Sequence, residues 1–434
     1  MGPMASTDTV SSLPGISLRE VTFDAPLDRS NPDRGTIEVF ARIVTGEGGE
    51  DRPYLVYLQG GPGSEAPRPT GDPFGPSWLE RALRDFRVVM IDQRGTGRST
   101  PVGLDAPLAA GAGLDVATLG EATPQQQAEY LTHFRSDEIV ADCEQLREIL
   151  GVRRWSLLGQ SFGGFCIVRY LSAASDSIEH ALLTGGLTSV GVDPVEVYAE
   201  TWRIMAAKSR RHYRRYPEDH ARMRRLMDLA AEGGIVLPDG STASPARLKG
   251  LGMLLGNSAG PARLHYLLEL EPTSPAFRHD LAACLPFGGR NPLYAVIHES
   301  CWADGVATRF AAERAMPDEV REDPTLLGGE HVSPVIFDED PELRPWKECA
   351  HILAEHEWPR LYDEDALRSS DVASAAAVYA DDAYVPMRYS LQTAALMPRL
   401  HPWITNEYEH NGLGPAGERI LDRLLGLATG RNAL

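Results

Sequence analysis

Short apolar runs of strand length occur toward both ends of the chain, and stretches with helical spacing separate them. The runs predict strands at residues 21–23, 36–44, 54–58, 87–92, 155–158 and 180–186, and the pattern resumes near residue 372. The run at 87–92 is almost continuously apolar, which is typical of a strand buried on both faces. Residues 125–150 and 416–427 instead carry apolar side chains at helical spacing.

The middle of the chain has a different pattern. Helix-forming segments with breakers between them occur at 194–216, 217–232, 244–255 and 262–270. At 434 residues the chain also exceeds the usual size of a single core, so we expect a main domain with a large insertion. The predicted parts are a flexible leader at 1–15, a core formed by 16–186 and 369–434, and a mainly helical insertion at 187–368.

Charge and composition limit the partners of the protein. The formal net charge of −19 argues against nucleic acid or an anionic membrane as a partner, because both would repel the protein at long range. No apolar stretch reaches the length of a membrane span, and the start of the chain lacks the pattern of a secretion signal. Five cysteines lie scattered without the spacing of a zinc site. We therefore expect a cytoplasmic protein without metal or cofactor, and the oligomeric state stays open.

Ser161 has the surroundings of a catalytic nucleophile. It lies in the sequence Gly-Gln-Ser-Phe-Gly at 159–163, directly after the apolar run 155–158 and before a helix-capable segment. The flanking glycines permit a sharp turn from strand to helix, which lifts the serine hydroxyl out of the sheet. Because such a motif also arises by chance in a glycine-rich chain, its support comes from three further segments.

The first of these segments is a glycine-rich corner at 60–63, which follows the apolar strand 54–58. A serine hydrolase needs two N–H donors aimed at the oxyanion, and bare backbone at such a corner can approach a substrate closely. We assign the two donors to Gly61 and Phe162. The alternative is an ordinary turn at the end of a strand.

The other two segments supply an acid and a base. A strand of small residues ends in Asp381 and Asp382, so either carboxylate can lie at the carboxyl edge of the sheet. His410 follows the last strand-like run and completes the chain order Ser, Asp, His. In this hypothesis His410 takes the proton of Ser161 as it attacks a carbonyl, the aspartate holds the imidazole tautomer, and water then cleaves the acyl-enzyme.

Several motifs carry a resemblance to a known family. They lie at 60–63, 88–99 and 159–164, and further ones at 134–142, 264–269, 297–299, 329–330 and 409–413. Together they resemble the longer bacterial branch of the proline iminopeptidases, or prolyl aminopeptidases, over roughly residues 21–427. The resemblance implies an α/β-hydrolase fold with a mostly parallel central sheet and a large helical cap at 187–368. It also favours Asp382 over Asp381, because related hydrolases have a proline four residues after the acid.

An aminopeptidase of this kind must recognise a protonated α-amine, and a buried ammonium requires carboxylate partners. The resemblance points first to Glu299, because relatives contact the amine through a glutamate followed three positions later by an aromatic residue, here Trp302. Glu269 and Glu330 are further candidates, although any of the three could be a solvated carboxylate. Three aromatic residues could wall a pocket for a small ring: Trp302, Phe162 and Tyr384.

Two basic features have ordinary interpretations beside functional ones. The stretch 208–225 is rich in arginine and could dock an acidic protein, but a solvated helix face balanced by nearby acids is the favoured interpretation. Arg94 and Arg98 follow the buried strand 87–92, and we expect them to fix neighbouring loops rather than to react.

Three functions follow from these observations. The leading one is an exopeptidase that releases an N-terminal residue, with proline preferred, from short peptides. The second is an amidase that strips an aminoacyl group from a small-molecule amine with the same triad. The third is a non-catalytic binding protein that keeps the hydrolase fold, and the intact Ser161, Asp382 and His410 argue against it. The first two share one chemistry, so the sequence does not separate them.

Overall fold

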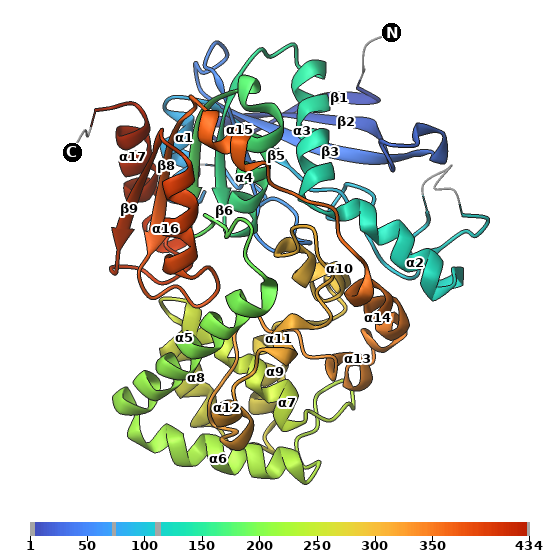
Figure 1. Ribbon diagram of the computed structural model, residues 1–434, viewed down its shortest axis with the longest axis vertical. Helices are drawn as coiled ribbons and strands as arrows, with labels where there is room; N and C mark the ends of the chain where they lie inside the picture. The colour runs from blue at the N-terminus through green and yellow to red at the C-terminus, as the bar shows by residue number, and fades with distance from the viewer. Residues whose placement is uncertain (1–4, 72–74, 109–113, 432–434) are drawn as a thin grey trace.

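The protein is built on a nine-stranded sheet with a helical insertion beside it (Figure 1). The structure is a computed structural model and describes residues 5–71, 75–108 and 114–431. Within these residues the strands are β1 Thr7–Leu13, β2 Ile16–Pro26, β3 Thr36–Gly46, β4 Tyr54–Leu58, β5 Arg87–Ile91, β6 Trp155–Gln160, β7 Ile178–Thr184, β8 Ala373–Tyr379 and β9 Leu400–Thr405. Their order across the sheet is β1-β2-β3-β5-β4-β6-β7-β8-β9.

The sheet is mostly parallel, as predicted. Strands β1, β2, β3 and β5 pair antiparallel, and every pair from β5 through β4, β6, β7 and β8 to β9 is parallel. Side chains of β5 alternate between two apolar clusters, with Val88 and Met90 in one and Val89 and Ile91 in the other. Burial on both faces explains the continuous apolar run in this strand.

Helices cover both faces of the sheet. Helices α1 (Ser77–Leu83) and α17 (Leu413–Ala428) pack on each other, and their apolar residues share one cluster with Val88. Helices α3 (Ser136–Ile149) and α4 (Phe162–Ala174) pack on each other and belong to the cluster of the opposite face. The remaining helices of the sheet region are α2 Pro124–Leu131 and α16 Met387–Leu396.

Between β7 and β8 the described chain forms helices, as the sequence predicts for the insertion (Figure 1). They are α5 Pro194–Arg215, α6 Pro217–Ala231, α7 Pro245–Leu248, α8 Gly260–Leu268, α9 Pro275–Cys284, α10 Pro292–Ile297, α11 Ala311–Arg314, α12 Asp318–Glu322, α13 Ile336–Glu339, α14 Lys347–Glu355 and α15 Glu364–Ser369, with a 3-10 segment at Lys249–Gly256. Proline in the first turn begins many of them, because its missing N–H is not needed there.

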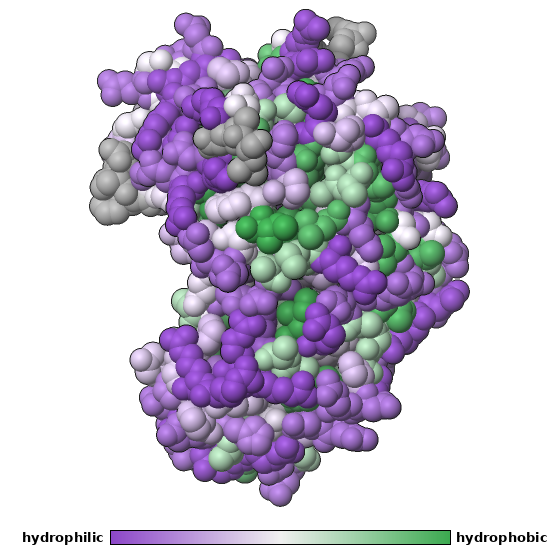
Figure 2. All heavy atoms as spheres, turned by 60° about the vertical axis from the view of Figure 1, so that its left-hand side comes forward, coloured by the Kyte–Doolittle hydropathy of each residue, from purple (hydrophilic) through white to green (hydrophobic). Residues whose placement is uncertain are grey.

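Helices α5 to α14 of the insertion form the lower part of the molecule in Figure 1, whereas α15 lies higher, beside α4 in the sheet region. Figure 2 shows a mostly hydrophilic surface with hydrophobic side chains gathered at the waist between these two parts. The last helices of the insertion contact the sheet region, because α14 packs against α2 and α15 against α4. Contacts between the insertion and the sheet region therefore continue across the predicted boundary near residue 368.

The predicted flexible leader is wrong for residues 7–13. These residues form β1, which pairs with β2 through a tight turn at Gly15 with φ of 76°. Every residue of β1 is exposed, so backbone pairing rather than apolar burial fixes this edge strand. A strand without a buried face leaves no apolar alternation in the sequence, which explains why the pattern did not reveal it. Residues 1–4 of the predicted leader lie outside the described residues.

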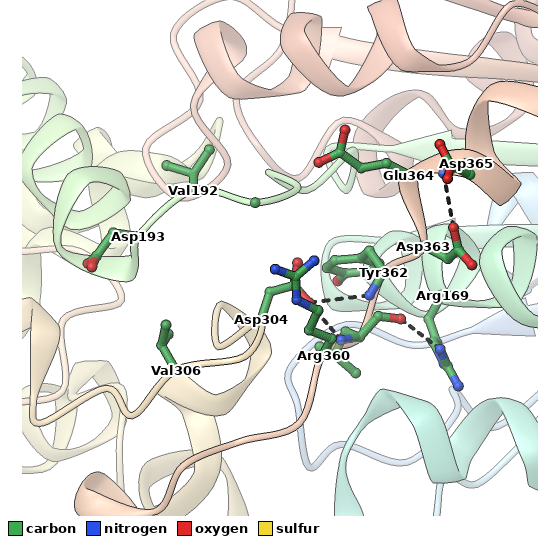
Figure 3. Close-up of a pocket in the computed structure, with 12 residues that line it drawn as sticks. Arg169, Val192, Asp193, Asp304, Val306, Arg360, Tyr362, Asp363, Glu364 and Asp365 are labelled. Atoms are coloured by element: carbon green, nitrogen blue, oxygen red, sulfur yellow. Dashed lines mark hydrogen bonds between the residues drawn. The ribbon is translucent and has the colours of Figure 1, made fainter.

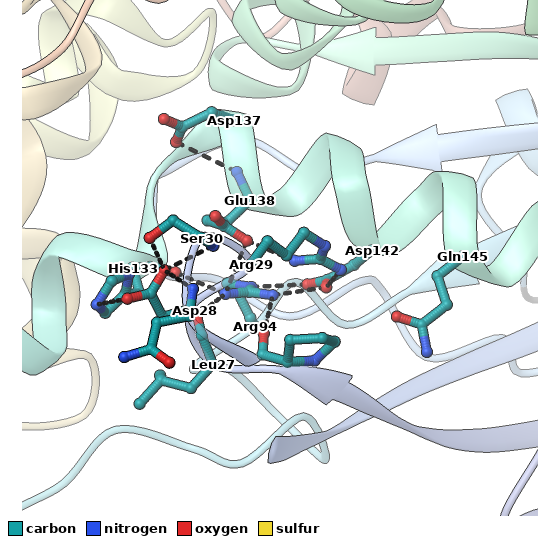
Figure 4. Close-up of polar contacts among 12 residues, drawn as sticks. Leu27, Asp28, Arg29, Ser30, Arg94, His133, Asp137, Glu138, Asp142 and Gln145 are labelled. Atoms are coloured by element: carbon teal, nitrogen blue, oxygen red, sulfur yellow. Dashed lines mark hydrogen bonds and ion pairs between the residues drawn. The ribbon is translucent and has the colours of Figure 1, made fainter. Parts of the chain in front are cut away.

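Arg94 fixes the loops around it, as predicted (Figure 4). Its guanidinium is fully buried and donates to both carboxylate oxygens of Asp142 on α3, at 2.7 and 2.6 Å. It also donates to the carbonyl oxygens of Leu27 and His133, at 3.1 and 2.8 Å. A buried guanidinium with this many acceptors ties the end of β2, α3 and the loop after β5 together. Arg98, whose side chain is about half exposed, forms an ion pair with Glu20 of β2 at 2.7 Å.

Other features of the composition have simple structural counterparts. None of the helices in the described parts of the chain combines the length and the hydropathy that a membrane crossing requires. The five cysteines are buried and carry free thiols. Across residues 5–71, 75–108 and 114–431, we find no cluster of three His, Cys, Asp or Glu side chains suited to a metal ion.

Candidate active site

Ser161 occupies a strained turn between β6 and α4. Its φ of 56° and ψ of −126° are rare for a residue with a side chain, so the surrounding structure must impose them. The glycines around it permit close approach of the backbone. A Cβ atom on Gly163 would lie 1.9 Å from the carbonyl oxygen of Leu58, and one on Gly159 would lie 2.4 Å from that of Gly163. The geometry is that of a nucleophile elbow.

Asp382 and His410 form a buried pair at the carboxyl ends of β8 and β9. The Nδ1 atom of His410 lies 2.8 and 3.0 Å from the two carboxylate oxygens of Asp382. The carboxylate also accepts the N–H groups of Tyr384 and Val385, at 2.9 and 3.0 Å. Burial by itself would lower the pKa of His410, but the Asp382 carboxylate, together with a smaller contribution from Glu330, holds that pKa above its usual value.

Asp381 lies apart from this pair, although it is the neighbour of Asp382 in the chain. Its side chain is about half exposed and forms an ion pair with Arg211 at 3.0 Å. Asp381 and Asp382 both lie beyond β8, which ends at Tyr379, so the turn after the strand sets the different directions of their side chains. The structure thus brings Asp382, and not Asp381, to His410.

Ser161 and His410 both lie against the end of β7. The N–H of Ser161 donates to the Thr184 carbonyl oxygen at 3.1 Å, and a Cβ atom on Gly186 would lie 2.2 Å from the Ser161 carbonyl oxygen. A Cβ atom on Gly185 would lie 3.2 Å from Nδ1 of His410. Among the described residues, no hydrogen bond joins the Ser161 hydroxyl to the imidazole. Such contacts are often loose without substrate, and this last link of the triad is part of our proposal.

The glycine-rich corner after β4 lies beside the elbow. A Cβ atom on Gly60 would lie 3.0 Å from Cβ of Ser161, and Gly61 has a φ of 131° that favours glycine. Phe162 begins α4, so its N–H belongs to the first turn, which has no acceptor within the helix. Gly61 and Phe162 thus both belong to backbone next to the nucleophile, and their role as oxyanion donors stays a prediction.

Glu299 is buried, and both of its carboxylate oxygens are already engaged. They accept the N–H groups of Ala311 and Ala312 at 2.9 Å each, at the start of α11. Burial raises the pKa of Glu299, while these backbone donors oppose the rise. The contacts give Glu299 a clear structural task, which is to hold the start of α11.

Glu330 has the more suitable surroundings for an amine. It accepts a hydrogen bond from the hydroxyl of Tyr294. Its charge helps to raise the pKa of His410, which places the carboxylate within electrostatic reach of the imidazole. Glu269 is about half exposed and lies 3.4 Å from Nε2 of His265 on α8. The geometry reverses the order expected from sequence and favours Glu330.

Aromatic rings line the interior between the elbow and the insertion. Trp302 is buried and meets Phe165 of α4 edge to face, with ring centroids 4.7 Å apart. Phe162 lies next along this row, 6.1 Å from Phe165. Tyr384 meets His410 edge to face at 4.8 Å. The row gives the neighbourhood of Ser161 an apolar wall on the side of the insertion.

A cavity of about 860 Å³ lies where the chain enters and leaves the insertion (Figure 3). Asp193 lies on the entering segment, and Asp304 accepts the N–H of Leu361, at 2.7 Å, on the leaving one. Arg169 of α4 donates to the Leu361 carbonyl oxygen at 2.8 Å. The triad residues do not line this cavity, so it lies outside the candidate site. Another cavity, of about 650 Å³, is lined by Tyr294 and by Ser64 beside the glycine-rich corner.

The basic stretch 208–225 is largely paired within the protein. The pairs are Lys208 with Glu409, Arg210 with Glu319, Arg211 with Asp381, Arg222 with Asp219 and Arg224 with Asp323. This pairing agrees with a helix face balanced by nearby acids. Docking of an acidic partner stays a prediction.

Comparisons with known proteins place this geometry among hydrolases. Residues 53–237 match the family model described as alpha/beta hydrolase fold, which confirms the predicted fold. The chain is 41% identical to a proline iminopeptidase of Aeromonas sobria, over 96% of this chain and 97% of that protein. It is 28% identical to a proline iminopeptidase of Aspergillus aculeatus, over 95% and 94%. A solved 2-hydroxy-6-oxo-6-phenylhexa-2,4-dienoate hydrolase of Rhodococcus sp. strain RHA1 aligns with 97% of this chain and 100% of its own, at 14% identity and a TM-score of 0.42.

Proposed function

The chain belongs to the proline iminopeptidase family, and from this premise we propose that it is a serine aminopeptidase that releases an N-terminal residue, with proline preferred, from short peptides. The observation that carries the proposal is the buried Asp382–His410 pair, which lies beside the strained turn of Ser161 at the carboxyl edge of the sheet. Parallel sheets of this type gather their chemistry at that edge.

The proposed reaction begins when His410 Nε2 takes the hydroxyl proton of Ser161 as the serine oxygen attacks the substrate carbonyl. The N–H groups of Gly61 and Phe162 receive the oxyanion, and Asp382 stabilises the imidazolium that forms. His410 then gives its proton to the leaving amine as the amide bond breaks. Water, deprotonated by the same imidazole, attacks the acyl-enzyme and releases the free residue.

Amine recognition is assigned to Glu330, with Tyr294 holding its carboxylate in place. A protonated N-terminus removed from water needs such a charge, because an unpaired buried ammonium is costly. Trp302 and Phe162 supply an apolar wall for the side chain of the released residue. Glu299 instead holds the start of α11 through the N–H groups of Ala311 and Ala312.

The proposed role of residues 187–368 is that of a cap over the site. Ser161 and His410 are buried, although each follows the carboxyl end of a strand, where the sheet stops. The His410 N–H donates to the carbonyl oxygen of Gly256 at 3.1 Å, so the insertion reaches the catalytic loop. Enclosure of this kind limits the substrate to a chain end and excludes bulk water.

A panel of aminoacyl chromogenic amides tests this function. Prolyl amides are expected to be cleaved fastest, N-acetylprolyl amides at least about 100-fold more slowly because they lack the ammonium, and Ser161→Ala to show no turnover. Cleavage of lipid esters without cleavage of any aminoacyl amide would overturn the proposal. Aminoacyl derivatives of small-molecule amines belong in the same panel, since faster cleavage of these than of prolyl peptides would assign the amidase function instead.

For location we propose the cytoplasm. The support is the set of five buried cysteines with free thiols, which suits a reducing compartment. Fractionation of cells that express the chain tests this, and activity confined to the medium would contradict it.

A further inference from the structure

Two basic side chains on α5 reach from the insertion to the core. Lys208 donates to the carboxylate of Glu409, and Arg211 donates to that of Asp381 at 3.0 Å. Each acceptor is the chain neighbour of a proposed triad residue, since Glu409 precedes His410 and Asp381 precedes Asp382. The two contacts differ in burial. The Lys208 side chain is 3% exposed, whereas those of Arg211 and Asp381 are about half exposed.

The loop that carries His410 is anchored to the insertion on both sides of the imidazole. The backbone N–H of His410 donates to the Gly256 carbonyl oxygen at 3.1 Å. The side-chain oxygen of Asn411 accepts from both the N–H and the hydroxyl of Ser258 at 3.0 Å, and its amide donates to Asn257 at 3.0 Å. Lys208 and Glu409 complete this set as its charged contact.

A buried ammonium is costly, and its pairing with one carboxylate contributes little net stability compared with apolar packing. Such a pair is most useful where it holds a loop in one of several possible geometries. We propose that Lys208 is a positioning residue which, through Glu409, holds the loop of His410 in its working geometry. In this proposal, which rests on the proposed function, the cap does more than enclose the substrate, because its first helix sets the place of the general base.

The charge of Lys208 also acts on the imidazole. Four titratable groups contact the His410 side chain or act on its charge: Asp382, Tyr384, Glu330 and Lys208. Glu409, which pairs with Lys208, is the neighbour of His410 in the chain. The carboxylates of Asp382 and Glu330 raise the pKa of His410, and the ammonium of Lys208 opposes them. The two effects of Lys208 can therefore be separated. Its positioning of the His410 loop changes the maximal rate, whereas its charge moves the pH at which the rate falls.

The test measures kcat/KM on a prolyl chromogenic amide between pH 5 and 9 in three variants. Lys208→Met should move the acid limb up by roughly half a pH unit to one unit, and should lower the plateau of kcat/KM roughly 10-fold through kcat. Glu409→Gln leaves the ammonium without its counter-charge, so its acid limb should move down. The double variant should return the limb to the wild-type position and keep the lower plateau.

Arg211→Met is the matched control, because it removes an equivalent contact from the same helix at an exposed position. Its pH profile should stay within about twofold of wild type, since exposed ion pairs contribute little. A Lys208→Met profile that matches wild type would overturn the inference. Acid limbs of Lys208→Met and Glu409→Gln that move in the same direction would also overturn it. Removal of opposite charges shifts the limbs in opposite directions, whereas a general loosening of the loop does not depend on which charge was removed.

A second measurement tests the role of Lys208 even if the proposed function is wrong. If wild-type protein cleaved no aminoacyl amide, the proposed function would fail by itself. An NMR titration of the His410 imidazole in wild type and Lys208→Met would then still report on the inference. A higher pKa in the variant shows that the ammonium acts on the imidazole, and equal pKa values together with unchanged resonances of the residues around His410 overturn the inference. Circular dichroism of each variant identifies any protein that has not folded.

Discussion

The hydroxyl of Tyr294 donates a hydrogen bond to Glu330, and the carboxylate that it orients lies within electrostatic reach of His410. Both residues belong to the insertion, whereas His410 belongs to the core. A substrate amine held at Glu330 would therefore place the amide bond that follows it near the proposed triad. The distance between an N-terminus and its first amide bond is fixed, so the proposed arrangement would select exopeptidase cleavage.

Glu330→Gln is expected to lower kcat/KM for prolyl amides roughly 100-fold, because a charge-assisted contact to the ammonium contributes about 3 kcal/mol. Steady-state kinetics with free and N-acetylated prolyl amides measures the effect. The acetylated substrate has no ammonium, so its slow cleavage should change little in the variant. Equal losses for both substrates would show that Glu330 serves the fold rather than the amine.

Glu299→Gln should act on stability more than on catalysis. The substituted amide can accept only one of the two N–H groups now bound at 2.9 Å, and the other is left unsatisfied in the interior. We expect a loss of about 1–3 kcal/mol in the free energy of unfolding, measured by urea denaturation. A fall in kcat/KM as large as that of Glu330→Gln, with unchanged stability, would restore Glu299 as the contact to the amine.

The contrast between these two glutamates illustrates which site residues can be predicted from the sequence and which cannot. The elbow around Ser161 was predictable because its glycines act on the chain next to them, and His410 because of its place after the last strand. The resemblance to relatives pointed first to Glu299. Its contacts with Ala311 and Ala312, like the contact of Glu330 with Tyr294, depend on how the insertion folds. Contacts of this kind leave no local pattern in the sequence.

Two other outcomes have the same physical basis. Strand β1 was missed because none of its residues is buried, so no alternation of apolar and polar residues in the sequence marks its pairing with β2. The contact of Lys208 with Glu409 joins residues 201 positions apart, and the basic stretch around it predicts only a charged helix. In contrast, the helices of the insertion were largely predictable, because proline and glycine mark where each one starts or stops.

Asp382→Asn should lower kcat roughly 10³- to 10⁴-fold, because an amide can neither hold the required imidazole tautomer nor stabilise the imidazolium. Asp381→Asn is its neighbour-matched control and should stay within about twofold of wild type, since Asp381 forms only an exposed ion pair with Arg211. Single-turnover kinetics of acyl-enzyme formation measures both. Comparable losses in the two variants would contradict the assignment of the acid.

His331 should make stability depend on pH. Its Nδ1 accepts the N–H of Gly329 at 2.8 Å, Nε2 lies 2.8 Å from the hydroxyl of Thr201, and the ring stacks on Trp202. Burial lowers the pKa of His331 from 6.5 to about 3, because protonation would charge a ring that has no acceptor to spare at Nδ1. Between these values the unfolded chain binds a proton that the folded protein does not, so stability falls as pH drops from 6.5 toward 3.

His331→Gln separates this contribution from all other titrating groups, because glutamine can keep an acceptor and a donor without a proton to bind. Urea unfolding at intervals between pH 4 and 7 should show that wild type loses roughly 1.4 kcal/mol per pH unit more than the variant on the acid side of 6.5. His401→Gln, on an exposed part of β9, is the control and should keep the wild-type slope. If the curves of wild type and His331→Gln ran parallel, the ring would have to carry its proton in the folded protein, and its bond to Gly329 would have to open. The segment that holds Glu330 would then be mobile at acid pH, and amine recognition would weaken there before the protein unfolds.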